Sequence, residues 1–283
     1  MNPWWPVGLG VGGLALLALC ARPSTATPFR RKIMDYATRA ITWVAQTESR
    51  GNYGAQNKNL DGAGLSYGLI QWTQKSGSLG KLLQTMQARD PAAFDSVFAP
   101  DAARLLAVTT SLYPAVRMSL ALWAAPWTSR FDTAGRHPPF QEAQLQAAGA
   151  SEHWLAAVSV AEILGVWTER SAVLFFDRCV QQGPVQTPKI ATRLRDALLA
   201  QGRTSVPYYD LLRAFAARCA APYRRRIQPT ELVTPTGKEW RQVGDEWHQF
   251  AGTFDLYATI VARTGAILAD PTLADVDPRM AVA

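Results

Sequence analysis

The stretch from residue 33 to residue 64 constrains the fold of this chain more than any other. Its first part carries apolar residues at helical steps of four, four and three: Ile33, Ala37, Ile41 and Val44. One more step of four gives Glu48, so a glutamate continues the apolar stripe of the predicted helix. Gly51 and Gly54 follow, and residues 57–64 are rich in the turn formers Asn, Asp and Gly. The pattern predicts a helix that ends near Glu48 and leads at once into a tight turn.

Helical spacing dominates most of the remaining chain. We expect helices at residues 78–89, 101–124, 140–148, 151–164, 172–181, 189–200, 208–220 and 240–268. Residues 65–73 are aromatic and β-like, and with the turn before them they predict a small hairpin. Two tryptophan pairs stand at helical steps and are expected in the core: Trp123 with Trp127, and Trp240 with Trp247. The predicted fold class is mainly α (α+β), a helical domain with a small β-hairpin element beside a cleft.

The composition limits the classes of protein to which such a chain belongs. The chain has 283 residues, of which 48% are hydrophobic and 18% charged, so it has ample material for a core and is not a disordered polymer. The net charge of +7 predicts a polyanionic partner: nucleic acid, a membrane surface or an anionic polysaccharide. The sequence holds no RGG tract, zinc knuckle or comb of Lys and Arg, so we expect no nucleic-acid partner.

Residues 1–26 differ in composition from the rest of the chain. Residues 4–21 are apolar and uncharged, and Arg22 follows them. A Ser-Thr-Ala site at residues 24–26 favours a cleaved signal peptide, whereas the lack of a basic residue before the apolar run favours a short membrane anchor. We expect an exported protein, periplasmic, extracellular or membrane-anchored, with a domain that covers residues 27–283.

The cysteines and histidines give little support for a metal site. No Cys or His spacing matches a metal-binding pattern, so we expect no metal and no cofactor. If residues 1–26 are removed, Cys179 and Cys219 remain as a pair that an exported protein could join in one bridge. The sequence leaves the state of this pair open.

Glu48 and Asp61 form a pair of carboxyl residues with contrasting surroundings. Glu48 ends an apolar stripe at the C-terminal end of a helix, where burial and the negative end of the helix dipole both disfavour the ionised form. Asp61 lies in a polar turn, where the ionised form is solvated. Cleavage of a glycosidic bond needs one protonated and one ionised carboxyl. The spacing alone also fits an exposed helix-end glutamate and an ordinary Asp-Gly turn.

The residues around this pair resemble the lysozyme-like superfamily. Glu48-Ser49 at a helix end, followed by Gly64-Leu-Ser-Tyr-Gly-Leu-Ile-Gln71, resembles goose-type lysozymes and lytic transglycosylases. The stretch from Asp61 to Leu79 is still more similar to family 46 chitosanases, and so is a second patch at residues 172–183. This sequence departs from the family 46 pattern in two ways. Ala63 replaces the usual Arg, and the interval between the two carboxyl residues is closer to the goose-type one.

The resemblance implies a lysozyme-like fold and a glycosidase with assigned roles. Glu48 would be the general acid, Asp61 the base that activates water, and Ser66 the residue that holds this water. Asp177 would form an internal ion pair with a neighbouring arginine: Arg170 or Arg178. With Asp61 as the base, we expect an inverting hydrolase. A lytic transglycosylase, for which one Glu suffices, is the alternative.

The expected substrate is a β-1,4-linked amino-sugar polymer, either peptidoglycan or chitosan. Within residues 52–81 Asp61 is the only carboxylate beside three lysines, which favours anionic peptidoglycan over cationic chitosan. Five residues are predicted to bind the sugar chain: Tyr53, Asn57, Tyr67, Gln71 and Trp72. Core packing is an equal alternative for Trp72, and stabilisation of the turn is one for Asn57 and Gln71. The competing function is a non-catalytic glycan-binding envelope protein.

Overall fold

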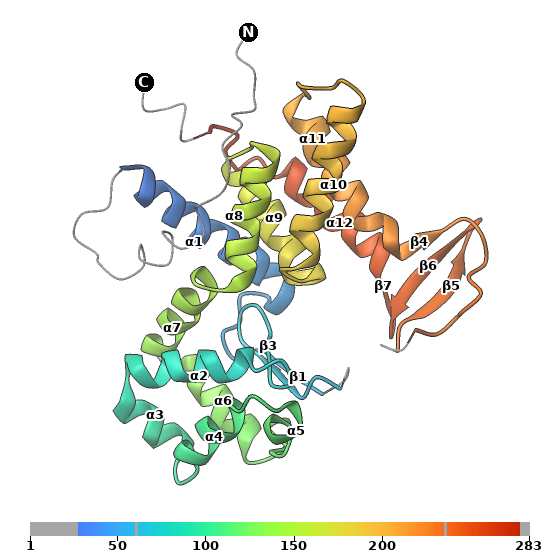
Figure 1. Cartoon of the computed structure of the whole chain (residues 1–283). Helices are drawn as coiled ribbons and strands as arrows, with labels where there is room; N and C mark the ends of the chain where they lie inside the picture. Colours follow the sequence, from blue (N-terminus) through green and yellow to red (C-terminus); the bar gives the residue numbers. More distant parts are fainter. Residues whose placement is uncertain (1–27, 60–61, 235–236, 278–283) are drawn as a thin grey trace. The chain divides into compact units, whose positions relative to one another are not determined.

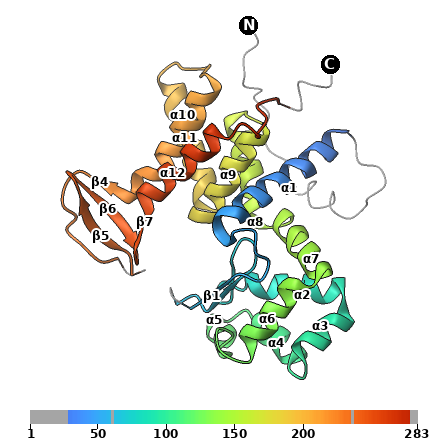
Figure 2. The same ribbon diagram turned by 180° about the vertical axis from the view of Figure 1, so that it is seen from behind.

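The computed structural model describes residues 28–59, 62–234 and 237–277, and of residues 28–35 the backbone only. These residues form two compact units (Figures 1 and 2). Unit 1 contains the described residues up to Ala40 and from Glu152 onward, and unit 2 is Ile41–Ser151. The boundary falls within the first helix, α1 (Pro28–Ser49). The expected domain of residues 27–283 therefore spans both units.

Unit 2 begins with the end of α1 and continues into a three-stranded antiparallel sheet. Its strands, in the order β1-β2-β3, are β1 (Gln56–Lys58), β2 (Leu65–Tyr67) and β3 (Trp72–Thr73). Helices follow: α2 (Ser78–Arg89), α3 (Pro91–Phe98), α4 (Ala102–Thr109), α5 (Pro114–Arg117), α6 (Trp127–Arg136) and α7 (Pro138–Gly149). Four buried rings from α3, α6 and α7 form the core among these helices: Phe94, Phe98, Phe131 and Phe140. The small hairpin predicted after α1 is thus present as part of this sheet.

The middle of unit 2 differs from the sequence prediction in two respects: helix α6 stands at residues 127–136, where a connector was expected, and the helix expected before it is interrupted. The single helix expected over residues 101–124 ends at Thr109, and only the short α5 follows it. Pro114 starts α5, as its fixed φ suits the first turn of a helix but removes a hydrogen-bond donor from a helix interior. The predicted core pair divides here, because Trp127 is buried whereas Trp123 is half-buried.

Unit 1 is a helical body around one buried helix. Its helices are α8 (Glu152–Leu164), α9 (Glu169–Gln182), α10 (Gln186–Ala200), α11 (Tyr208–Ala220) and α12 (Leu256–Ala269). In α9 every residue from Arg170 to Cys179 is buried. Its rings pack against the neighbouring helices. The ring centroids of Phe175 and Phe215 are 5.1 Å apart, and those of Phe176 and Trp154 are 5.9 Å apart. The helix α9 is therefore the centre of this unit's core.

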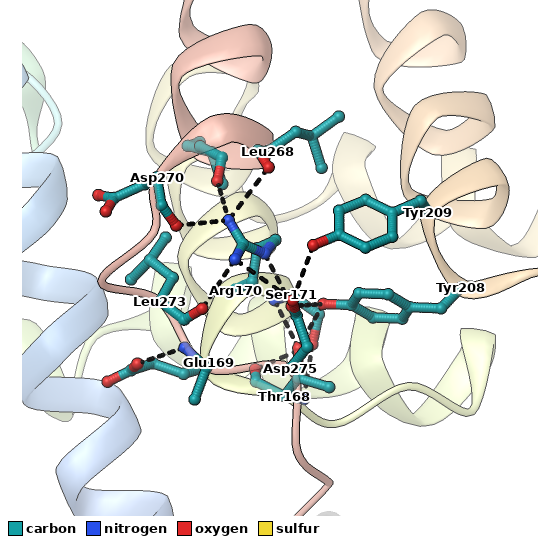
Figure 3. A network of polar contacts seen from close by, with 12 residues as sticks. Thr168, Glu169, Arg170, Ser171, Tyr208, Tyr209, Leu268, Asp270, Leu273 and Asp275 are labelled. Atoms are coloured by element: carbon teal, nitrogen blue, oxygen red, sulfur yellow. Dashed lines mark hydrogen bonds and ion pairs between the residues drawn. The ribbon is translucent and has the colours of Figure 1, made fainter.

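A buried arginine fastens the C-terminal segment to this body (Figure 3). The Arg170 guanidinium donates to the carbonyls of Ile267, Asp270 and Leu273 at 2.7, 2.9 and 2.7 Å, and to the Asp275 carboxylate at 2.7 Å. Burial alone would raise the pKa of Asp275, but hydrogen bonds from Arg170 and two tyrosines outweigh it and lower the pKa. One side chain thus caps the end of α12 and holds the residues after it.

The second antiparallel sheet of the protein belongs to unit 1 and lies beside the start of α12 (Figures 1 and 2). Its strands are β4 (Arg224–Arg225), β5 (Glu239–Val243), β6 (Glu246–Ala251) and β7 (Phe254–Asp255), in the order β4-β6-β5 with β7 also paired to β6. The prediction of a helix over residues 240–268 is therefore wrong before Leu256. Trp240 and Trp247 are seven residues apart, as in two helical turns, but they lie on different strands joined at Gly244. Both are half-buried rather than part of the core.

Candidate active site

Glu48 lies in the last turn of α1, next to a sharp change of chain direction. It is half-buried, and the residues on its helical stripe, such as Val44, are fully buried. Arg50 and Gly51 both adopt the left-handed conformation, with φ of 55° and 70°, which ends the helix. The Gly51 N–H donates to the Ala45 carbonyl at 3.0 Å, so the reversed chain is tied back to the helix. This turn places the hairpin directly after the glutamate.

The hairpin that should carry the second carboxyl group is held at its base. Asp61 itself lies outside the described residues, between Asn59 and Gly62. The Asn59 side chain accepts a hydrogen bond from the Gly64 N–H at 2.9 Å, across the loop. Asn59 has φ of 61°, a left-handed conformation that Asn tolerates better than most residues. The ends of the loop that bears Asp61 are therefore fixed to each other.

Ser66 and Asn57 are brought together by the register of the first two strands. They face each other as a direct pair between β1 and β2, and the side chains of such a pair lie on the same face of a sheet. Ser66 is buried and Asn57 is half-buried. The predicted role of Ser66, to hold the attacking water, remains a prediction.

Tyr53 lies in the turn before β1, and Gln71 lies in the turn between β2 and β3. The Tyr53 carbonyl accepts from the Gln144 side chain at 2.8 Å, and the tyrosine side chain is half-buried. Gln71 has φ of 56° and its amide donates to the Gly68 carbonyl at 3.0 Å, within its own turn. The geometry of Gln71 matches the alternative in which it stabilises the turn. Tyr53 remains a candidate for contact with a sugar ring.

Tyr67 and Trp72 lie in the core of unit 2. Tyr67 has no exposed surface, its ring centroid is 4.8 Å from that of Phe131, and its hydroxyl donates to the Phe131 carbonyl at 3.0 Å. Burial raises the pKa of its phenol, with a smaller contribution from Asp132. Trp72 is 6% exposed. This burial gives Tyr67 a packing role and matches the packing alternative for Trp72, while binding of the sugar chain by either residue stays a prediction.

Two buried glutamines, which the sequence analysis missed, hold the sheet in place. Gln74 accepts from the Leu65 N–H at 3.1 Å and donates to the carbonyls of Arg117 and Leu120 at 2.6 and 2.7 Å. Gln144 accepts from the Leu69 N–H at 3.0 Å. One signal in the sequence points to Gln144, because it stands on an apolar stripe of α7 at steps of four. Both side chains replace hydrogen bonds that the short strands cannot supply.

The same glutamines explain the two glycines of the sequence motif. A Cβ at Gly64 would lie 2.6 Å from the Gln74 side-chain oxygen, and one at Gly68 would lie 2.4 Å from that of Gln144. Both glycines also have positive φ, of 77° and 79°. Any side chain would therefore displace an amide that holds the sheet. In this protein Gly64 and Gly68 are therefore needed because the two glutamine side chains pack closely against the hairpin.

Asp177 belongs to unit 1, away from the residues of the hairpin in sequence, and is fully buried. The arginine beside it in α9, Arg178, donates to one carboxylate oxygen at 3.0 Å, and Arg263 of α12 donates to the other at 2.9 Å. Of the two partners that the resemblance allowed, Arg178 is therefore the one in contact, and Arg170 pairs with Asp275 instead. The group links α9 to α12 inside the core of unit 1.

The cysteines and two searches of the described residues complete the description of the structure. Cys179 and Cys219 are buried free thiols, and burial raises the pKa of each to about 12. In the part of the chain that the structure describes, no three His, Cys, Asp or Glu side chains gather as a metal site would require. Within the same residues, no helix has the length and apolar character needed to cross a membrane.

Comparisons with known proteins identify the fold. No protein-family model and no curated protein matches the chain. A solved chitosanase from Bacillus subtilis, in complex with 6 GlcN, superposes with a TM-score of 0.52 at 16% identity, over 86% of this chain and 89% of its own. The family 46 chitosanase from Gynuella sunshinyii, in complex with chitotetraose, gives 0.50 at 17% identity, over 86% and 88%. This likeness confirms the predicted mainly helical, lysozyme-like fold that resembles family 46 chitosanases.

Proposed function

We propose that this chain is a glycosidase that cleaves β-1,4 bonds of an amino-sugar polymer, with Glu48 as the general acid. The main support is the position of Glu48. It is half-buried in the last turn of a helix, in line with buried residues, and a hairpin follows at once. A general acid has to stand next to the glycosidic oxygen that it protonates, and a side chain at a helix end beside a hairpin can reach a bound polymer. The fold shared with two chitosanases adds independent support.

In the proposed reaction Glu48 gives its proton to the oxygen of the leaving sugar. Asp61, on the tied loop between β1 and β2, removes a proton from the water that attacks the opposite face of the ring. In this proposal Ser66 and Asn57, a direct pair between β1 and β2, hold that water. An inverting reaction of this kind requires the two carboxyl groups to be about 6.5–9.5 Å apart. If Asp61 is dispensable, the substrate's own 6-hydroxyl attacks and the protein is a lytic transglycosylase.

Two substrates fit this site, each for its own reason. The hairpin region carries Lys58, Lys75 and Lys81, all exposed, and its only carboxylate is Asp61, which favours an anionic polymer such as peptidoglycan. Chitosan is the second candidate, since both superposed chitosanases were solved with glucosamine oligomers or chitotetraose. We rank peptidoglycan first because charge in the region of the site acts on the substrate directly.

A parallel assay of two polymers tests both statements. The wild type is compared with Glu48→Gln and with Glu142→Gln, a matched control at an exposed glutamate of the same unit that pairs with Arg89. Clearing of purified sacculi and release of reducing ends from chitosan are measured together. We expect Glu48→Gln to lower the rate by about 10²–10⁴ on the preferred polymer, with the control unchanged.

Each other outcome of this assay changes a specific statement. Equal rates for Glu48→Gln and the wild type would remove the catalytic assignment. Cleavage of chitosan alone would reverse the order of the two substrates. Binding to either polymer without cleavage by the wild type would identify a glycan-binding protein that only shares the fold.

We also infer that the chain is exported through residues 1–26, which lie outside the described residues. The support is the uncharged apolar run at residues 4–21. Cell fractionation followed by determination of the mature N-terminus tests it. A new N-terminus near residue 27 identifies a signal peptide, an intact one in the membrane fraction identifies an anchor, and an intact soluble cytosolic chain contradicts export.

A further inference from the structure

We propose that unit 1 carries a second glycan-binding surface, separate from Glu48, which holds carboxylate or phosphate groups of an anionic amino-sugar polymer. The surface combines a pocket lined by three arginines with the outer face of the second sheet. The inference depends on the proposed function in one respect, namely that an amino-sugar polymer is the substrate. Its own support comes from side chains that the catalytic proposal does not use.

The first component is an open pocket of about 380 Å³ where α10, α11 and β4 meet. Its charged lining is Arg193, Arg218 and Arg225, one from each element, and the rest is apolar. All three are exposed, and none has a carboxylate partner among the described residues. Arginines on the same helices are neutralised locally, as in the pair Arg195–Asp196. Three guanidiniums around one hollow therefore form a site for a carboxylate or phosphate, which guanidinium binds in a bidentate manner.

The second component follows from the register of the sheet. Trp247 pairs with Arg225 on one side and with Gln242 on the other, so these three side chains lie on one face. By the same register Trp240 and Phe254 lie on that face too. We call this set the aromatic face: Arg225, Trp240, Gln242, Trp247 and Phe254. Phe254 is 70% exposed and both tryptophans are half-buried, so the rings are open to a ligand.

The acidic residues of the strands all lie on the opposite face. Glu239, Glu246 and Asp255 occupy alternate positions to the aromatic face, by the same register. They are used internally: Glu246 pairs with Arg224 at 3.2 Å and Asp255 with His248 at 2.7 Å. That face packs on α12, where the His248 ring lies 4.8 Å from that of Tyr257. The sheet therefore separates its charges, leaving cationic and aromatic groups outward.

Arg225 joins the two components into one surface. Its guanidinium lies 5.3 Å from the Trp240 ring centroid, and the same side chain lines the arginine pocket. One of its terminal nitrogens donates to the carbonyls of Ala221 and Arg224 at 3.4 and 3.1 Å, and the remaining N–H groups of the stacked cation can bind a ligand. Aromatic faces contact the apolar C–H faces of sugar rings, and the Gln242 amide can bond a hydroxyl or N-acetyl group. The arginine pocket beside the aromatic face thus matches a sugar chain that bears an acidic substituent.

Nucleic acid is the rival occupant, because exposed aromatics also stack on bases. We favour the glycan because the proposed active site already acts on an amino-sugar polymer. Carboxymethyl chitin serves as the anionic probe and glycol chitin as its neutral counterpart. Binding of both to the full chain is measured in the Glu48→Gln background, so that cleavage does not remove the probe, and single-stranded DNA is added as a competitor.

The test variant is Arg193→Gln/Arg218→Gln/Arg225→Gln. Its matched control, Arg89→Gln/Arg104→Gln/Arg203→Gln, removes the same charge from exposed arginines elsewhere. We expect about tenfold weaker binding of carboxymethyl chitin for the test variant alone, with glycol chitin unchanged. Phe254→Ser should weaken both chitins, and it serves as a second variant if the triple variant has a lowered Tm.

Three results would overturn the proposal. The first is an equal loss of carboxymethyl chitin binding in the test and control variants. The second is full binding of carboxymethyl chitin by both the triple variant and Phe254→Ser. The third is displacement of the bound chitin by DNA at a lower concentration than by unlabelled carboxymethyl chitin. Hydrolysis of a short soluble oligomer by variants with Glu48 intact is measured in parallel. If the oligomer is not hydrolysed but carboxymethyl chitin is still bound through the arginines, only the proposed function is contradicted. If the oligomer is hydrolysed but carboxymethyl chitin is not bound through them, only this surface is contradicted.

Discussion

The two small sheets of this protein are similar in size and opposite in construction. The sheet of β1–β3 in unit 2 is locked from behind, since β2 is fully buried and two buried glutamines bond its strands and turns. The sheet of β4–β7 in unit 1 presents most of β5 and Phe254 to solvent. The first is built to hold its strands and turns together. The second is built to display side chains.

The difference extends to the polar groups that each sheet uses. Behind the first sheet, neutral amides satisfy backbone N–H and carbonyl groups in a dry core, where an orphaned group is costly. On the inner face of the second, ion pairs such as Arg224–Glu246 are partly exposed and contribute little each. We conclude that substitutions at the first sheet change stability strongly, whereas those at the second change it weakly.

The largest effect is expected at Gln74. Gln74→Met keeps the volume but orphans the Leu65 N–H and the Arg117 carbonyl, and the Leu120 carbonyl keeps only its bond from the Leu122 N–H. We expect the free energy of unfolding to fall by about 3 kcal/mol or more, measured by urea denaturation. Gln71→Met is the control, because Gln71 is half-buried and makes one bond to its own turn. Equal costs at the two positions would remove the contrast between a locked and an open sheet.

Tyr67→Phe gives a smaller effect and separates packing from substrate binding. It removes the hydroxyl that donates to the Phe131 carbonyl and leaves the ring in place. The expected loss is about 1 kcal/mol of unfolding free energy, with the KM for polymer unchanged. A raised KM at unchanged stability would instead restore the predicted role of Tyr67 in sugar binding.

Phe254→Ser in the second sheet is expected to have the smallest effect on stability. The side chain is 70% exposed, and surface substitutions usually change the free energy of unfolding by less than about 0.5 kcal/mol. The measurement is the thermal unfolding midpoint beside that of Tyr67→Phe. A loss larger than that of Tyr67→Phe would mean that the aromatic face is part of a core.

The sequence predicted these two sheets with unequal success, for a physical reason. Around residues 57–73 the Asn, Asp and Gly residues form turns through local backbone chemistry, which a sequence displays directly. Around residues 239–255 the spacing of Trp240 and Trp247 imitates two helical turns, and the strand pairing that decides the matter is not local. The turn at Gly244-Asp245 was the signal for a hairpin there.

The candidate site shows the same limit. The position of Glu48 followed from helical periodicity, because a stripe of apolar residues reports its own orientation. The burial of Tyr67 depends on Phe131, and the support from Gln144 comes from a helix 75 residues later in the chain. Such contacts are set by tertiary packing, so the sequence alone did not show that Tyr67 packs in the core, and its role in sugar binding stays a prediction.

The central claim is that Glu48 donates the proton to the leaving sugar. The most direct measurement compares cleavage of the polymer with release of dinitrophenol from an aryl glycoside of the same amino sugar, for the wild type and Glu48→Gln. Dinitrophenolate leaves without a proton, so we expect a loss of about 10²–10⁴ on the polymer and a far smaller loss on the aryl glycoside. Equal losses on both substrates, or none on either, would contradict it.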